Sequence, residues 1–130
     1  MKINDSKNNL LAIIIRSDDI PEGKYFETEN EQSIQLASFK LKEETIIEKH
    51  IHPKQERKIL NTSEVLIMLE GEMEVTIYDE KLNFVQSETI YAGDTLGLFS
   101  GGHGLKLQKD SKFIEVKQGP YNPETDKKRF

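Results

Sequence analysis

The sequence predicts an all-β protein, for three reasons. Apolar residues alternate with polar ones or come in short β-branched runs, and no long segment keeps a helical spacing. Turn signals such as Glu70-Gly71-Glu72 and Ala92-Gly93-Asp94 separate these runs at short intervals. Many short strands at such spacing are typical of a sandwich or a barrel.

The expected strands begin with the β-branched run Leu11 to Arg16, which the turn Ile20-Pro21-Glu22-Gly23 separates from the next. Alternation or β-branched residues mark the others, which are Ser33 to Leu41, Thr45 to His52, Glu64 to Glu70, Glu72 to Tyr78, Phe84 to Tyr91, Asp94 to Phe99, Gly104 to Gln108 and Phe113 to Gln118. The charged run Lys54 to Thr62 predicts a loop or a short helical excursion. The tail Gly119 to Glu124 carries two prolines, so we expect it to leave the sheet and wrap the surface, with a helical turn near Thr125 to Arg129.

Length and composition exclude several classes of protein. A chain of 130 residues fits one domain with one core, spanning residues 1–130. The net charge of −5 gives no general attraction to nucleic acid or to an anionic membrane. Since the chain has no cysteine, disulfides, thiolate metal sites and thiol catalysis are excluded. No apolar run is long enough for a membrane helix or a signal peptide, so we expect a cytoplasmic protein.

Two of the expected strands are apolar on both faces. Ile46 and Ile47 point to opposite sides of one strand, as Leu66 and Val65 do in the next. A strand that is apolar on both sides is normally covered on both. The N-terminal strands or a second subunit would supply the outer cover, and a homodimer is our preferred interpretation.

The three histidines of the chain fall where one metal ion could use all of them. His50 and His52 alternate in a strand-like run, so both imidazoles point from the same face. His103 lies among glycines, which let the backbone turn sharply and approach a site closely. Glu64 begins the strand-like run between them. This set of nitrogen and oxygen ligands predicts a mononuclear site for one divalent transition metal: iron, manganese, nickel or zinc.

The same residues resemble the two sequence motifs of the cupins. The first motif has two alternating histidines, then a glutamate, then a glycine after six intervening residues, as in His50-Ile51-His52, Glu64 and Gly71. The second begins with a glycine and ends with a histidine, as in the segment from Gly93 to His103. The resemblance implies a cupin-type double-stranded β-helix, or jelly-roll barrel, with a core of about residues 34–118, extra N-terminal strands, a short C-terminal tail and the metal in its mouth.

The chain departs from the cupin pattern at both motifs. Eleven residues separate His52 from Glu64, more than the family's usual few, and Glu56 has the shorter spacing. We prefer Glu64 as the ligand because its interval to Gly71 places it in the barrel, and we keep Glu56 as a rival ligand or a catalytic general base. Phe99 stands where the second motif usually has a proline, and that motif is one residue short before His103.

The resemblance also suggests what the pocket holds. Leu66, Met68, Leu98 and Phe99 would line the barrel, and Arg57 would contact a polar substrate. The segment Gln118-Gly119-Pro120-Tyr121 resembles a small stand-alone cupin group that is similar to proteins encoded beside surface-polysaccharide or sugar-nucleotide biosynthesis. We therefore expect a metal-binding cupin with a small polar, sugar-related ligand and isomerase-like or epimerase-like chemistry. The alternatives are a non-heme iron dioxygenase and a non-enzymatic small-molecule-binding or sensory cupin.

Overall fold

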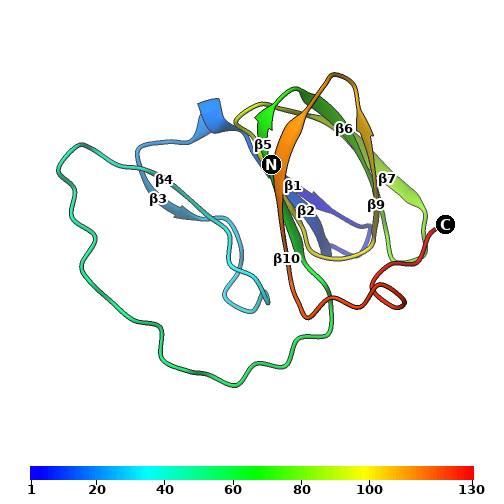
Figure 1. The fold of residues 1–130 in the computed structure, drawn as a ribbon, viewed down its shortest axis with the longest axis horizontal. Coiled ribbons are helices and arrows are strands. Elements are labelled where there is room, and N and C mark those ends of the chain that lie inside the picture. Colours follow the sequence, from blue (N-terminus) through cyan, green and yellow to red (C-terminus); the bar gives the residue numbers. More distant parts are fainter.

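The computed structural model describes all residues 1–130, and it confirms the all-β prediction (Figure 1). Apart from one short 3-10 turn at Ser17–Asp19, every regular element is a strand. In chain order the strands are β1 (Lys2–Asn4), β2 (Leu10–Ile15), β3 (Gly23–Phe26), β4 (Ala37–Lys40), β5 (Glu64–Glu70), β6 (Glu72–Tyr78), β7 (Phe84–Tyr91), β8 (Thr95–Leu98), β9 (Gly102–Leu107) and β10 (Lys112–Lys117).

The strands form three antiparallel sheets. The first sheet has the order β1-β2-β8-β5-β10, the second has the order β7-β6-β9, and β3 pairs only with β4 in a separate hairpin. The first and second sheets face each other as a sandwich that is not closed into a barrel. From β5 onward the chain passes repeatedly from one sheet to the other, so strands that follow each other in sequence often lie in different layers.

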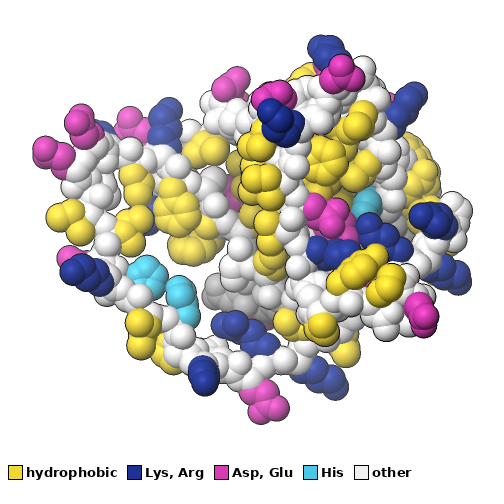
Figure 2. Space-filling model, in the orientation of Figure 1, with side chains coloured by type: hydrophobic (Ala, Val, Ile, Leu, Met, Phe, Trp, Pro, Cys, Tyr) yellow, Lys and Arg dark blue, Asp and Glu magenta, His cyan; other side chains and the backbone are white.

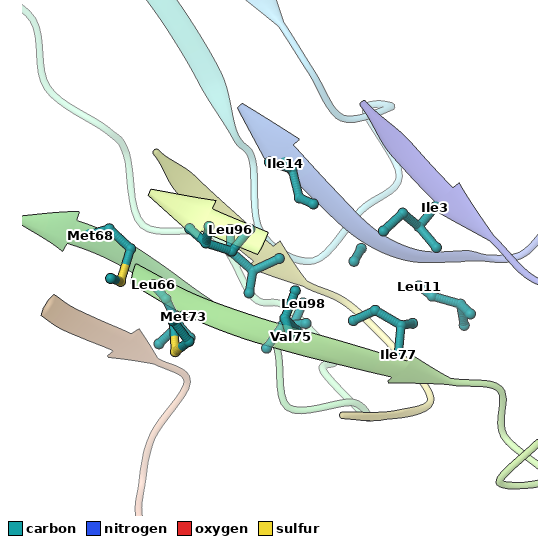
Figure 3. Close-up of a cluster of buried hydrophobic side chains, with 12 residues drawn as sticks. Ile3, Leu11, Ile14, Leu66, Met68, Met73, Val75, Ile77, Leu96 and Leu98 are labelled. Carbon is teal, nitrogen blue, oxygen red and sulfur yellow. The ribbon is translucent and has the colours of Figure 1, made fainter. Parts of the chain in front are cut away.

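The core lies between the first and second sheets (Figure 3). Strand β6 alternates between buried and half-buried residues, as the sequence predicts for a strand with one face inward. Its inward residues meet the inner faces of β2, β5 and β8 in one cluster of buried side chains, which comprises Ile3, Leu11, Ala12, Ile14, Leu66, Met68, Met73, Val75, Ile77, Ile90, Leu96 and Leu98. Burial of this apolar surface is the main stabilising contribution to the sandwich.

A sharp corner at Gly71 carries the chain from the first sheet into the second. Gly71 has a φ of 89°, a left-handed conformation that residues with a Cβ rarely adopt. A Cβ at this position would overlap the backbone of Asp110 and the side chain of Ser111. The neighbouring Glu72 N–H donates to Ser111 Oγ at 3.2 Å, which joins this corner to the loop between β9 and β10.

Polar contacts close one side of the sandwich, where β2 of the first sheet meets β7 of the second. The Arg16 Nη1 atom donates to the Thr89 carbonyl oxygen and to Asp94 Oδ2, both at 2.6 Å. Arg16 Nη2 also lies 3.3 Å from Glu88 Oε2. Asp94 is buried and accepts a further hydrogen bond from the Tyr91 N–H at 3.0 Å, so every charge that reaches into this side has a partner.

The loop of the hairpin covers the outer face of the first sheet. Ile13, Gly97 and Val65 lie opposite one another on β2, β8 and β5. Leu36, from the loop between β3 and β4, places its Cδ2 atom 3.2 Å from where a Cβ on Gly97 would be. Ile13 and Val65 are buried as a result. At this position the chain itself therefore supplies the cover that the two-sided apolar pattern predicts.

The structure corrects several predicted elements. Thr45 to His52 forms no strand, because no neighbouring strand pairs with it, and Ser33 to Leu41 shortens to β4. Strands β1 and β3 were not predicted. The tail makes its single turn earlier than expected, where the Asp126 N–H donates to the Asn122 carbonyl oxygen at 2.9 Å. No helix in the structure is long and apolar enough to span a membrane.

Residues 41–62, here called the arm, form the largest departure from the predicted barrel. The arm leaves the hairpin after β4 and runs as a wide loop away from the sandwich before it returns to the start of β5 (Figure 1). Its apolar side chains are exposed, and three of them almost fully: Ile46 at 81%, Ile51 at 85% and Leu60 at 83%.

Candidate functional site

Glu64 and His103 form the candidate site on the inner faces of the two sheets. Glu64 is the first residue of β5, and His103 lies in β9 opposite the core residue Ile77. His103 Nε2 lies 3.4 Å from Glu64 Oε2. Although Glu64 is only 8% exposed, its carboxylate therefore has a partner. The structure brings these two predicted ligands together across the sandwich.

Positive groups around Glu64 favour its charged form. A hydrogen bond from His103 lowers the pKa of the Glu64 carboxyl, and the charges of His103, Lys127 and Lys117 act in the same direction against the opposing effect of burial. Glu64 is thus an ionised, inward-facing carboxylate beside an imidazole, the pair of groups that metal sites and proton-transfer sites use most often.

The pair opens into a pocket of about 610 Å³ between the sandwich and the C-terminal tail. Most of the lining residues are polar or charged, and they are Thr62, Glu64, Tyr78, Gly101, Gly102, His103, Gly104, Leu105, Asp126, Lys127, Lys128, Arg129 and Phe130. The cluster of three basic residues from the tail adds positive charge next to Glu64. Such a pocket suits a small polar ligand that carries negative or hydroxyl groups.

Two contacts hold the tail over this pocket. Lys117 Nζ donates to Asp126 Oδ2 at 2.6 Å, and this contact raises the pKa of Lys117. The Phe130 ring packs edge-on against the ring of Tyr78, with 5.1 Å between their centroids. Sequence reasoning missed the tail as part of the site, although the run Lys127-Lys128-Arg129 followed by an aromatic residue gave a signal in a segment otherwise expected to wrap the surface.

The other two histidines lie on the arm. The rings of His50 and His52 have centroids 5.1 Å apart, so the alternate spacing does place them side by side. His50 Nδ1 donates to the Glu48 carbonyl oxygen at 2.9 Å. Figure 2 shows the histidines in cyan, with an adjacent pair on the arm and a single side chain at the sandwich. In this conformation no group of three or more metal-ligating residues forms.

The remaining predicted site residues lie outside the pocket. Glu56 and Arg57 are exposed on the arm. Leu66, Met68 and Leu98 belong to the buried core, and Phe99 is buried against Gly97. None of these side chains lines the pocket at Glu64. The expected barrel wall is therefore a packed core, and the pocket walls come from β9 and the tail.

Comparison with known proteins gives one match. Residues 23–90 match the family described as Domain of unknown function (DUF6016). No curated protein and no solved structure matches the chain. The matched segment contains the hairpin, the whole arm with His50 and His52, and strands β5 to β7 with Glu64, whereas His103 lies beyond it.

Proposed function

We propose that this chain, which belongs to the DUF6016 family, is a cupin-type metal-binding protein whose ligands are His50, His52, Glu64 and His103. The observation that carries the proposal is the Glu64–His103 pair, with 3.4 Å between Nε2 and Oε2, at the inner end of an open pocket. A buried carboxylate beside an imidazole supplies two of the four donors. The arm supplies the other two.

The order of the strands supports a cupin-type jelly roll. Strands β5, β8 and β10 are neighbours in the first sheet, and β7, β6 and β9 are neighbours in the second. A jelly roll winds eight strands between two sheets in this alternating manner. The two strands that would complete it belong next to β10 and β9, whose outer edges are free, and they would come directly before β5. The hairpin and arm occupy that part of the sequence.

The alternation of residues in the arm fits the free edge of β9. If Thr45 to His52 pairs antiparallel with β9 and His50 lies opposite His103, then Ile46 lies opposite Leu107 on the same inner face. Leu105 and Leu107 already face the core, opposite Val75 and Met73. This register buries Ile46 with Leu105 and Leu107 and brings both arm imidazoles to Glu64.

The donor set suits a catalytic metal ion rather than a closed structural one. Three imidazoles and one carboxylate leave open positions on an octahedral ion, at which a bound metal would polarise a carbonyl or hydroxyl oxygen as a Lewis acid. Lys127 and Arg129 would hold anionic groups of the substrate, and Glu56, on the arm, would carry a proton. We infer a small polar, sugar-related substrate and isomerase-like or epimerase-like chemistry.

The pocket lining favours this proposal over an iron dioxygenase. An iron dioxygenase site with a predominantly apolar wall would not need the basic cluster Lys127 to Arg129, which lies at the pocket. A non-enzymatic binding or sensory cupin would use the same ligands and the same basic cluster, and it would show saturable binding of a metabolite without turnover.

Elemental analysis of the purified, untagged protein tests the metal site. We expect about one equivalent of a single transition metal per chain, its loss in the double variant His50→Ala, His52→Ala, and weakened binding in His103→Ala. Lys49→Ala is the matched control, because Lys49 directly precedes His50 and points from the opposite face of the same segment. A wild-type protein that takes up no metal on reconstitution, or a double variant that keeps it, overturns the proposal.

A further inference from the structure

We propose that the arm of one copy of this chain adds as a strand to the free edge of β9 in a second copy, reciprocally, so that each candidate site is built from two chains. The pairing of strands stands on the fold alone. The delivery of His50 and His52 to Glu64 and His103 rests on the metal site proposed above.

The first observation is that residues aimed at the core are exposed at the free edge of β9. This edge and the neighbouring free edge of β10 are here called the open side. Leu105 and Leu107 lie opposite Val75 and Met73, which are fully buried. Yet Leu105 is 40% and Leu107 is 51% exposed. Hydrophobic side chains run along β10 and lie in the hollow beside it (Figure 2). A core-facing leucine stays exposed only where the neighbouring strand is absent.

The second observation is that β9 and β10 present these edges next to each other. Each is the last strand of its sheet, and the short loop 108–111 joins them. On the outer face of the first sheet, Ile114 and Val116 of β10 are about half exposed, opposite Ile67 and Val65. An edge strand with free N–H and C=O groups and adjacent apolar side chains is a template for adding another strand.

The arm has the complementary properties. Ile46 and Ile51 are more than four-fifths exposed, and Leu60 is exposed to a similar degree. A free chain rarely leaves so many apolar residues in water along one segment. Thr45 to His52 has the alternation of a strand but no strand beside it. The arm therefore needs a sheet edge, and the open side needs a strand.

The position of the hairpin determines whether the arm can pair with the open side of its own chain or only with that of a second copy. The loop between β3 and β4 is anchored on the outer face of the first sheet through Leu36 on Gly97 and through Ser33 Oγ, 3.4 Å from Ser63 Oγ. The layer that the hairpin forms lies two sheet spacings, about 20 Å, from the second sheet, which contains β9. The chain from Lys40 to Thr45 reaches about 17 Å when fully extended. With the hairpin docked, Thr45 thus falls short of its own β9, and the arm points away from the sandwich (Figure 1).

A disulfide trap tests the pairing, because the chain contains no cysteine of its own. In the double variant Ile46→Cys, Leu107→Cys the register above places the two thiols opposite each other across the pair. We expect oxidation to give a covalent dimer on a non-reducing gel. The control Ile47→Cys, Leu107→Cys moves the first thiol to the opposite face of the arm and should cross-link far less. An intrachain disulfide in a monomer, or a monomeric wild-type protein by light scattering, overturns the proposal.

A complementation experiment tests the shared site without new cysteines. Neither His50→Ala, His52→Ala nor Glu64→Gln, His103→Ala has a complete ligand set in its own homodimer. When the two variants are refolded together, half of the dimers are mixed, and each mixed dimer holds one complete site of its two, so about one quarter of the wild-type metal content returns. Ligands that come from one chain would give no recovery. Because the disulfide trap needs no metal, a covalent dimer without metal would refute the metal site and leave the strand exchange standing.

Discussion

The Glu64–His103 contact makes a pH-dependent contribution to stability. The pKa of Glu64 is lowered in the folded protein, chiefly by the hydrogen bond from His103. Because the unfolded chain takes up the proton first on acidification, this contribution is complete above the ordinary glutamate pKa of about 4.3 and is lost as pH falls through the lower folded value. We expect the urea midpoint of the wild-type protein to fall more steeply below pH 5 than that of Glu64→Gln, which lacks the titrating group.

At neutral pH the same substitution should cost about 1 kcal/mol, since His103 is partly exposed and solvent screens the pair. Glu115→Gln is the matched control, because Glu115 is an exposed carboxylate on the neighbouring strand β10 and takes part in no ion pair. Parallel pH profiles for the wild-type protein and Glu64→Gln would contradict the assignment of this dependence to Glu64.

Among the structural elements, the corner between β5 and β6 depends on one glycine. Gly71→Ala combines an unfavourable φ of 89° with an overlap on the backbone of Asp110, so we expect a loss of about 1–3 kcal/mol in the free energy of unfolding. Gly104→Ala is the control, since no atom lies within 4 Å of its added Cβ. That change should be neutral or stabilising by up to about 1 kcal/mol. Equal urea midpoints for the two variants would show that the corner tolerates a side chain.

The sequence predicted the long strands of the sandwich most accurately. Strands β5, β6 and β7 begin and end at the predicted residues, because alternation runs through each of them and the turns at Gly71, Asp79 to Lys81 and Gly93 separate them from their neighbours in the chain. Thr45 to His52 has equal alternation but no strand beside it, and alternation describes a strand's faces without naming its partner. Strand β3 was missed because its short segment lies among turn residues.

For the candidate site, the sequence predicted the ligand types and part of their arrangement. It placed Glu64 and His103 in one site, and the structure brings them together. It also placed His50 beside His52, and their rings are neighbours. The tail residues from Lys127 to Phe130 could not be placed at the pocket, because a tail's docking depends on contacts such as Lys117 with Asp126 that no local pattern encodes.

For the whole molecule, the sandwich is closed on one side and open on the other, and this asymmetry locates the candidate site. Arg16 ties β2 to β7 on the closed side. The open side leaves Glu64 and His103 accessible and presents the only edges at which the arm's histidines could join them. At the proposed metal site, binding of the ion would be coupled to completion of the fold, because any ion that holds all four ligands must also hold the arm in place.

This coupling predicts that metal protects one part of the arm from trypsin and leaves another part exposed. Lys49 lies in the segment that we place beside β9, whereas Arg57 lies in the run that joins it to β5. At a free metal concentration about 100-fold above Kd, binding stabilises the closed arm by about 2.7 kcal/mol, which slows cleavage after Lys49 up to about 100-fold when cleavage follows the open population. Cleavage after Arg57 should keep its rate and serves as the internal control for direct effects of metal on the protease. In Glu64→Gln the protection at Lys49 should weaken, since the ion loses its carboxylate ligand. Mass spectrometry of the fragments over time gives both rates. Equal slowing at the two sites, or no slowing at either, would contradict the prediction that the metal holds the segment around Lys49 beside β9.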